Sequence, residues 1–296
     1  MAIVTLTTDM GTRDFYVAVV KARLISQLAN VQIVDISHEV DKFDIGQAAY
    51  LLRNVYKDFP TGSVHIISVR PAFAAHRPHV VVKMDGHFFI SADNGIFSFL
   101  FDRNPDEVFE LIIKQDTDDL TFPTKNIFTK AAIHLAKGGT PEVIGRRSEI
   151  KNRYSRLNPI SDADMIKGHV THIDSYENVI TNISQSMFND IGRGREFEVL
   201  FRRTRIKQIH RTYSEVHPGE AVALFGASGF LELAINQGTH QMGGGASSLL
   251  GLKVDDMIRI EYDTKVGQDD VQTGTDATVQ SPIRQTEGQN SELRRL

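Results

Sequence analysis

Residues 2–30, AIVTLTTDMGTRDFYVAVVKARLISQLAN, decide the fold that we expect. Residues 2–8 are apolar and β-branched, as in a buried strand, and residues 14–30 carry apolar side chains at helical spacing. The same order continues with a strand at residues 31–37, a helix at 43–59 and a strand at 62–69. This alternation predicts a parallel-rich sheet flanked by helices, in which ligands lie beyond the carboxyl ends of the strands.

The rest of the chain changes character twice. Residues 79–91 are expected to form two strands around an Asp85-Gly86 turn, and residues 126–139 a helix closed by glycines. Farther along, short strands alternate with turn residues, and the last part of the chain is polar and without period. We therefore expect an α/β N-terminal domain at residues 1–157, a smaller all-β, barrel-like C-terminal domain at residues 158–262 and a disordered tail at residues 263–296.

The composition limits what the protein can do. A net charge of −4 argues against nucleic acid as a partner, because such binding needs a basic surface. No apolar run is long enough for a transmembrane helix and no signal peptide is recognisable, so no membrane partner is expected. The absence of cysteine fits a cytoplasmic enzyme. The 11 histidines lack the spacing of a zinc site, and no metal is expected.

Asp9 stands where the first strand ends and a glycine turn begins. A carboxylate in this position can accept hydrogen bonds from both hydroxyl groups of a ribose, as acidic residues do in dinucleotide sites. The alternative is that Asp9 caps the helix expected to start near Asp14. The residues alone leave both interpretations open.

The stretch IDSYENVITNIS, residues 173–184, combines Asp174, Tyr176 and Asn178. An asparagine amide offers one acceptor and two donors, which can match the edge of an adenine. The same residues also suit a hairpin turn in which the asparagine adopts a left-handed conformation. SADNGIF, residues 91–97, is expected to be a turn that borders a site.

SVRPAFAAHR, residues 68–77, places Arg70 and Arg77 at the end of a buried strand. Two arginines there indicate either a solvated turn or a site for an anion. The basic stretch at residues 201–211 is expected to be a strand with one charged, solvated face. Residues 226–238 have a glycine-rich entry that could bring backbone groups up to a ligand.

Several segments, taken in order, resemble one family: TTDMGTRDFYVAVVKA, DISHEVDKFDIGQAAYLL, GSVHIISVRP, ISADNGIFSFLF, TFPTKNIF, HIDSYENVITNI and SGFLELAINQG. On these motifs the chain is identified as a member of the S-adenosylmethionine hydroxide adenosyltransferase family, whose relatives include fluorinating and chlorinating enzymes. The resemblance implies an α/β domain joined to a β-barrel-like domain. It also implies a homotrimer with active sites between the N-terminal domain of one subunit and the C-terminal domain of the next.

The resemblance implies a specific reaction, an in-line displacement at the ribose C5′ of S-adenosylmethionine. Methionine leaves from the sulfonium, and water or a halide enters from the opposite side. The sulfonium departs as a neutral thioether, so the protein has to align the reactants and supply the nucleophile. No cofactor is expected beyond S-adenosylmethionine as substrate.

The resemblance also assigns roles to residues on the nucleoside side of the site. Asp9 matches a ribose-binding aspartate, and Phe43 an aromatic residue near the ribose. Asn178 matches an adenine-reading asparagine, and Asp174 a carboxylate near the methionine amino group. Further substrate contacts are expected from Tyr213, which matches the residue that stacks on adenine, from Phe73 and Tyr176, and from the backbone around Ser228 and Gln237.

The nucleophile side departs from the family pattern. Members that use water carry an Asp, an Arg and a His that position the attacking water, and the loop that reads DPGVGTxR in them reads RPAFAAHR here. Arg77 fits the family arginine, but Arg70 stands in the place of the aspartate. Pro123 replaces the histidine and Thr124 the following glycine. Neither Arg70 nor Pro123 can accept a proton.

The altered loop leads to four expectations about function. The first is a slow hydrolysis of S-adenosylmethionine to adenosine and methionine, with Arg77, Arg70 and Thr124 at the reacting end. The alternatives are a non-catalytic adenine-nucleoside binder, a halide-using adenosyl transferase and a structural trimer without ligand. An unpaired arginine ~4 Å from the sulfonium would cost about 4 kcal/mol at an effective dielectric constant near ~20. Arg70 is therefore expected to point away, to pair with an acid, to have an anion between it and the sulfonium, or to face a ligand other than this cation. The possible partners are Asp93, Asp119 and the ligand's own carboxylate.

Overall fold

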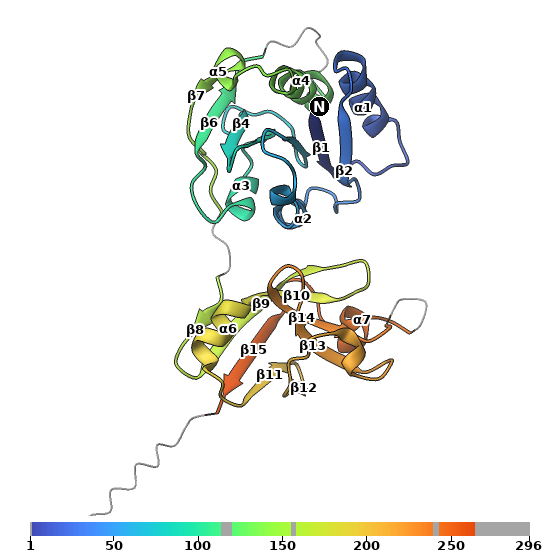
Figure 1. Ribbon diagram of the computed structural model, residues 1–296, viewed down its shortest axis with the longest axis vertical. Coiled ribbons are helices and arrows are strands. Elements are labelled where there is room, and N and C mark those ends of the chain that lie inside the picture. The colour runs from blue at the N-terminus through green and yellow to red at the C-terminus, as the bar shows by residue number, and fades with distance from the viewer. Residues whose placement is uncertain (1, 114–119, 155–157, 239–242, 264–296) are drawn as a thin grey trace, which may run out of the picture. The chain divides into compact units, whose positions relative to one another are not determined.

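The computed structural model describes residues 2–113, 120–154, 158–238 and 243–263 (Figure 1). The tail expected at residues 263–296 lies, apart from its first residue, outside the described residues. Within the described ranges, no helix is both long and apolar enough to cross a membrane. The described chain contains one sheet in its N-terminal part and a second in its C-terminal part.

The N-terminal sheet is mixed and rich in parallel pairs, in the order β2-β1-β3-β5-β4-β6-β7. Parallel pairs join β1 to β2, β1 to β3 and β3 to β5, whereas β4, β6 and β7 are added in antiparallel fashion. The strands are β1 (Ile3–Thr8), β2 (Gln32–Ser37), β3 (Val64–Ser68), β4 (His79–Met84), β5 (His87–Ala92), β6 (Glu107–Leu111) and β7 (Gly145–Arg147). The expected parallel-rich sheet is therefore confirmed.

Helices cover both faces of this sheet (Figure 1). On one face, α1 (Tyr16–Gln27) and α4 (Thr129–Ala136) pack on apolar residues of β1, β3 and β5. On the other, α2 (Ile45–Arg53) and α3 (Ile96–Leu100) pack on β3, β4 and β5. Because both faces are covered, β3 is buried along its whole length. The short elements η1 (Tyr56–Asp58) and α5 (Pro141–Ile144) complete this part.

Two local predictions in this part can be compared directly with the structure. Asp85 and Gly86 have φ values of 51° and 80°, so both central residues of the β4–β5 turn are left-handed, as the hairpin signal predicts. The helix expected at residues 126–139 begins earlier, with a π-helical turn, η2 (Thr124–Phe128), that continues into α4. A wide turn of this kind is common at functional sites.

The C-terminal sheet is antiparallel and barrel-like, in the order β12-β11-β15-β9-β10-β14-β13, with β8 paired to β9. Its strands are β8 (Ile160–Ser161), β9 (Met165–Ile173), β10 (Val179–Ser184), β11 (Phe197–Phe201), β12 (Thr204–Ile206), β13 (Ala221–Phe225), β14 (Phe230–Ile235) and β15 (Met257–Tyr262). Alternate side chains of β9 are buried, which is the pattern of a strand with one face on a core.

This part also contains elements that the sequence does not predict. The helices α6 (Gln185–Gly192) and α7 (Ala246–Leu250) and the 3-10 turn η3 (Tyr213–Glu215) accompany the strands. In the basic stretch, Arg205 and Lys207 both pair with Glu198 of the neighbouring strand. That stretch carries the charged side chains expected of it, but only Thr204–Ile206 of the strand expected at residues 201–211 forms as a separate strand.

Candidate ligand-binding site

The polar end of the N-terminal sheet follows from its strand register. Thr8 of β1 pairs with Ser68 of β3, and β3 runs parallel to β5. The carboxyl ends of these strands therefore meet at one edge. Asp9, Arg70 and Asp93 follow the three strands at this edge, where open α/β sheets bind their ligands.

Asp9 is anchored to the segment before α2. Its Oδ2 accepts a hydrogen bond of 2.9 Å from the backbone N–H of Phe43, and Lys42 Nζ donates to its carbonyl oxygen. Phe43 has a left-handed φ of 69° and a side chain that is 66% exposed. The alternative interpretation of Asp9 as a helix cap is wrong, because the N-cap of α1 is Phe15 and no side chain caps it.

The loop at residues 70–77, which we call the arginine loop, is held in place by three side chains from outside it. Asn94 Nδ2 donates to the carbonyl oxygens of Val69 and Arg70, at 2.9 and 3.2 Å. His79 Nε2 forms a hydrogen bond of 2.8 Å with the carbonyl oxygen of Pro71. The third contact, from Asn152 to the carbonyl oxygen of His76, belongs to the network around Asp93.

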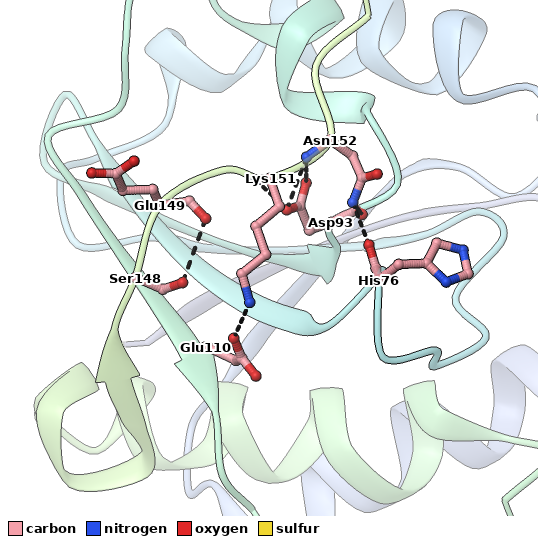
Figure 2. Close-up of polar contacts among 7 residues, drawn as sticks. All are labelled: His76, Asp93, Glu110, Ser148, Glu149, Lys151 and Asn152. Carbon is pink, nitrogen blue, oxygen red and sulfur yellow. Dashed lines mark hydrogen bonds and ion pairs between the residues drawn. The ribbon is translucent and has the colours of Figure 1, made fainter.

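Asp93 is the centre of that network (Figure 2). Its side chain is fully buried and accepts hydrogen bonds from the backbone N–H groups of Lys151, at 2.7 Å, and Asn152, at 3.3 Å. Asn152 Nδ2 donates to the carbonyl oxygens of both Asp93 and His76. Burial raises the pKa of Asp93, and these donors partly offset the shift. Asp93 therefore supports the loop, and the expectation that it pairs with Arg70 is wrong. The other candidate partner, Asp119, lies outside the described residues.

The two arginines of the loop carry charge that the described residues do not compensate. Neither Arg70 nor Arg77 forms an ion pair within the described ranges. Arg70 is exposed and has a left-handed φ of 49°. Arg77 is half-buried, and its Nε is a buried donor without a hydrogen-bond partner in the described chain. Phe73 is 65% exposed and lies edge-on to the His79 ring, with 5.5 Å between ring centroids.

Thr124 reaches the same edge from η2. Its Oγ1 lies 2.5 Å from Oγ of Ser68, the last residue of β3, and both side chains are fully buried. Sequence reasoning did not single out Ser68. It also missed His38, which follows β2 and whose Nδ1 lies 2.9 Å from Oγ1 of Thr8. The available signal was a polar residue at the end of a strand, a buried strand in the case of Ser68 and a partly exposed one in the case of His38.

In the C-terminal sheet, Asp174 and Asn178 close the β9–β10 hairpin. Asp174 Oδ1 accepts from the backbone N–H groups of Tyr176 and Asn178, at 2.9 and 2.8 Å, and its Oδ2 accepts from Asn178 Nδ2 at 3.1 Å. The left-handed residue is Glu177, with φ of 61°. The hairpin interpretation is therefore right about the turn and wrong about which residue is left-handed. Asn178 is buried and Tyr176 exposed.

Tyr213 joins this group through a residue that the sequence analysis missed. Its hydroxyl donates a hydrogen bond of 2.6 Å to Oε1 of Glu232, a buried acid on β14. Burial raises the pKa of Glu232, and the charge of Asp174 adds to the shift. Burial and the bond to Glu232 also raise the pKa of Tyr213. A single acid inside the apolar run FLELAI was the signal for Glu232.

Ser228 and Gln237 lie at opposite ends of β14. Ser228 is half-buried in the turn between β13 and β14, and Gln237 is exposed with a left-handed φ of 56° just after β14. The structure therefore places the candidate residues in three groups: the edge of the N-terminal sheet, the Asp174–Asn178–Tyr213–Glu232 cluster, and the two ends of β14. In the described chain, no group of three or more His, Asp or Glu side chains could hold a metal ion.

Fold and site together define a class of protein: a parallel-rich sheet with a polar strand edge, followed by a barrel-like antiparallel sheet. The chain belongs to the SAM hydroxide adenosyltransferase family, because the family's N-terminal domain matches residues 4–145 and its C-terminal domain residues 168–259. The (R)-S-adenosyl-L-methionine hydrolase of Thermus thermophilus is 30% identical over 264 residues, covering 86% of this chain and 97% of that protein.

A second relative and a solved structure extend this comparison. The fluorinase of Nocardia brasiliensis is 25% identical over 272 residues, covering 79% of this chain and 90% of that protein. The crystal structure of an uncharacterized conserved protein from Thermotoga maritima superposes with a TM-score of 0.79 at 28% identity, covering 88% of this chain and all of that one.

Proposed function

We propose that this protein cleaves S-adenosylmethionine at the ribose C5′ with water, giving adenosine and methionine at a slow rate. The observation that carries the proposal is the carboxylate of Asp9 at the end of β1, anchored by the backbone N–H of Phe43. A half-buried carboxylate beside an exposed aromatic ring suits a ribose, whose two hydroxyl groups need acceptors and whose ring carbons are apolar.

The proposed reaction forms an O–C5′ bond and breaks the C5′–S bond. The bonding electron pair goes to sulfur, methionine leaves as a neutral thioether, and the water oxygen loses a proton. Alignment of the water oxygen with C5′ and sulfur accelerates the displacement, and the proton that the water loses needs an acceptor. Ser68 and Thr124 supply no base, because their buried hydroxyl groups are bonded to each other and a hydroxyl is not a base at neutral pH. Because Arg70 and Pro123 accept no proton either, solvent takes it, and turnover is slow.

The residues of the C-terminal cluster complete the proposed site. Asn178 would read the adenine edge, Tyr213 would stack on the base, and Asp174 would accept from the methionine amino group. Ser228, Gln237 and Tyr176 would add substrate contacts, as would Phe43 and Phe73. We place Phe43 and Phe73 in an N-terminal domain, residues 1–157, and the other residues in a C-terminal domain, residues 158–262. The C-terminal domain of one subunit acts with the N-terminal domain of a neighbouring subunit in a homotrimer.

The direct test is incubation of purified protein with S-adenosylmethionine and quantification of adenosine by chromatography. Adenosine above a no-enzyme control, lost in Asp9→Asn and kept in Asp58→Asn, is the expected result. Asp58 is the matched control because it is an exposed acid of η1, away from the strand edge. Adenosine no higher than in the no-enzyme control would contradict the proposal.

The subunit arrangement has its own test. An inactive Asp9→Asn variant and an inactive Asn178→Ala variant are unfolded together, refolded and assayed. If each site combines two subunits, the mixture regains part of the activity, because some sites receive both intact residues. A mixture as inactive as its components, together with a monomeric mass in light scattering, would contradict the shared site.

The second candidate function is a non-catalytic binder of adenosine. Arg70 and Pro123 favour it, since both stand where water-using relatives are expected to carry an acid and a histidine. Calorimetry separates the candidates: saturable binding of adenosine without turnover of S-adenosylmethionine would favour the binder. A halide-using activity would instead yield a 5′-halogenated nucleoside when chloride or fluoride is added.

A further inference from the structure

The arginine loop carries two guanidinium groups for which the described chain offers no acid. Arg70 and Arg77 make no ion pair there, and the buried Nε of Arg77 lacks an acceptor. The two acids that follow neighbouring strands have other partners. Asp9 accepts from the backbone of Phe43, and Asp93 from the backbone of Lys151 and Asn152.

The backbone that carries these arginines is fixed. Asn94, His79 and Asn152 hold carbonyl oxygens at the beginning and the end of the loop. Inside it, Ala74 and Arg77 exchange two backbone hydrogen bonds, of 3.3 and 2.8 Å, in a tight turn. Figure 2 shows the Asn152 amide reaching the carbonyl oxygen of His76 while the His76 ring points away. These hydrogen bonds therefore hold the backbone of Arg70 and of Arg77 in one conformation.

A buried donor without an acceptor is costly, and native proteins usually satisfy such a group with protein, water or a ligand. The proposed substrate adds an electrostatic repulsion, because its sulfonium is positively charged and the two arginines have no acid partner in the described chain. An anion bound to the loop would satisfy the donor and reduce the repulsion.

We propose that the arginine loop binds a small oxyanion, of the carboxylate or phosphate class, and that this anion and S-adenosylmethionine bind with positive cooperativity. The cooperativity rests on the proposed function, whereas the oxyanion site rests on the loop alone. An oxyanion fits better than a monatomic halide, because the planar fork of a guanidinium donates parallel hydrogen bonds to two oxygens. The two ligands raise each other's affinity by the same factor, since linkage is reciprocal.

The experiment measures the affinity of S-adenosylmethionine by calorimetry in a zwitterionic buffer, with sodium acetate, sodium phosphate or sodium chloride at equal ionic strength. We expect the dissociation constant to be about tenfold to a hundredfold lower in acetate or phosphate than in chloride, within the usual range of coupling between sites. Arg70→Gln should remove this difference. Arg23→Gln, which removes the same charge from an exposed position on α1, should keep it.

The cooperativity, the proposed function and the oxyanion site are each overturned by a different result. Equal affinity in all three salts, or an unchanged salt effect in Arg70→Gln, overturns the cooperativity. Failure of S-adenosylmethionine to bind in any salt overturns the proposed function. The oxyanion site is then decided by titrating sodium phosphate alone: binding that Arg70→Gln abolishes supports it, and no binding to the unaltered protein overturns it. Thermal unfolding of each variant checks that it is folded.

Discussion

The strand edge of the N-terminal sheet and the acidic cluster of the C-terminal sheet carry charges of opposite sign. At the strand edge the acids are bonded to backbone N–H groups, and Arg70 and Arg77 keep their positive charge uncompensated within the described chain. In the C-terminal cluster, Asp174 and Glu232 are bonded to neutral donors, and the negative charge of Asp174 adds to the rise that burial causes in the pKa of Glu232.

This contrast indicates which part of a ligand suits each region. An acidic cluster suits cationic or donor groups, such as an amine or the amino edge of a base, and an arginine-rich loop suits an anion. S-adenosylmethionine carries an amine, an adenine, a carboxylate and a sulfonium. Only the sulfonium conflicts with the loop, so the loop is where substitutions should change function most.

The largest effect is expected from restoring the nucleophile side with Arg70→Asp combined with Pro123→His. Because both new side chains can accept a proton, hydrolysis of S-adenosylmethionine should rise by about a hundredfold, the lower end of the range for general-base catalysis. Adenosine production in single-turnover assays measures it. An unchanged rate would mean that Ala72 and Ala74, which stand in place of the two glycines of the family pattern, hold the loop backbone in a different path.

A loss of affinity for adenosine is expected from Asp9→Asn. Losing the charge weakens two hydrogen bonds to the ribose hydroxyl groups, each worth about 1.5–3 kcal/mol when one partner is charged, so adenosine should bind roughly a hundredfold more weakly. Calorimetry measures the change, and Asp58→Asn again serves as the control. If both variants bind adenosine as the unaltered protein does, the ribose does not lie at the end of β1.

The N-terminal and C-terminal sheets should also respond to pH with opposite sign. His65 is buried beside Thr5 and His87, and burial lowers its pKa to about 3. An unfolded histidine titrates near ~6.5, so below that pH the unfolded chain binds the extra proton and stability is lost as the pH falls. Between about pH 6.5 and 5 this amounts to roughly 2 kcal/mol. Urea unfolding at both pH values measures it, and His65→Asn should show a smaller loss.

Glu232 should act in the other direction. Its pKa is raised by burial, so the folded state holds its proton better than the unfolded state does. Its contribution to stability is present below the unfolded pKa, near ~4.3, and is lost as the pH rises through the folded pKa. The unaltered protein should therefore lose stability as the pH rises from the unfolded pKa of Glu232 to its folded pKa. Glu232→Gln should not show this loss, because a glutamine side chain does not ionise. A stability difference between the two proteins that does not change with pH would contradict this.

The smallest effect is expected from Tyr213→Phe. The substitution keeps the ring but leaves Oε1 of Glu232 without its donor, which should lower the free energy of unfolding by about 1–2 kcal/mol. Combining it with Glu232→Gln should recover part of the loss, because a neutral amide costs less to leave buried than a carboxylate. Urea unfolding of the single and double variants measures both steps.

The sequence predicts much of this molecule wherever a signal is local. The run of residues 2–8 gives β1, and the Asp85-Gly86 pair gives the left-handed turn between β4 and β5. Local signals fail where the deciding contact is distant. The short helix α7 and the wide turn of η2 are examples, since no side chain caps either of them. Helix α6 did carry a local signal, because the Ser184 side chain caps it by accepting from the backbone N–H of Met187.

The same division holds for the candidate site. Asp9, Arg77 and Asn178 could be named from motifs, and so could Asp174, the partner of Asn178 in the same hairpin. Contacts between distant segments could not. Ser68 meets Thr124 across 56 positions of sequence, and Asn152 meets His76 across 76. Nothing in the local composition of either segment indicates its partner.

The sequence alone determined the order of strands and helices, the family resemblance and the reversal of charge at Arg70, because each is written in adjacent residues. Only the tertiary structure decided that Asp93 accepts hydrogen bonds from Lys151 and Asn152 rather than pairing with Arg70. It also decided that Glu232 accepts a hydrogen bond from Tyr213 within the C-terminal cluster. The reason is physical: a buried acid takes the donors that folding brings within about 3 Å, and those donors come from any part of the chain.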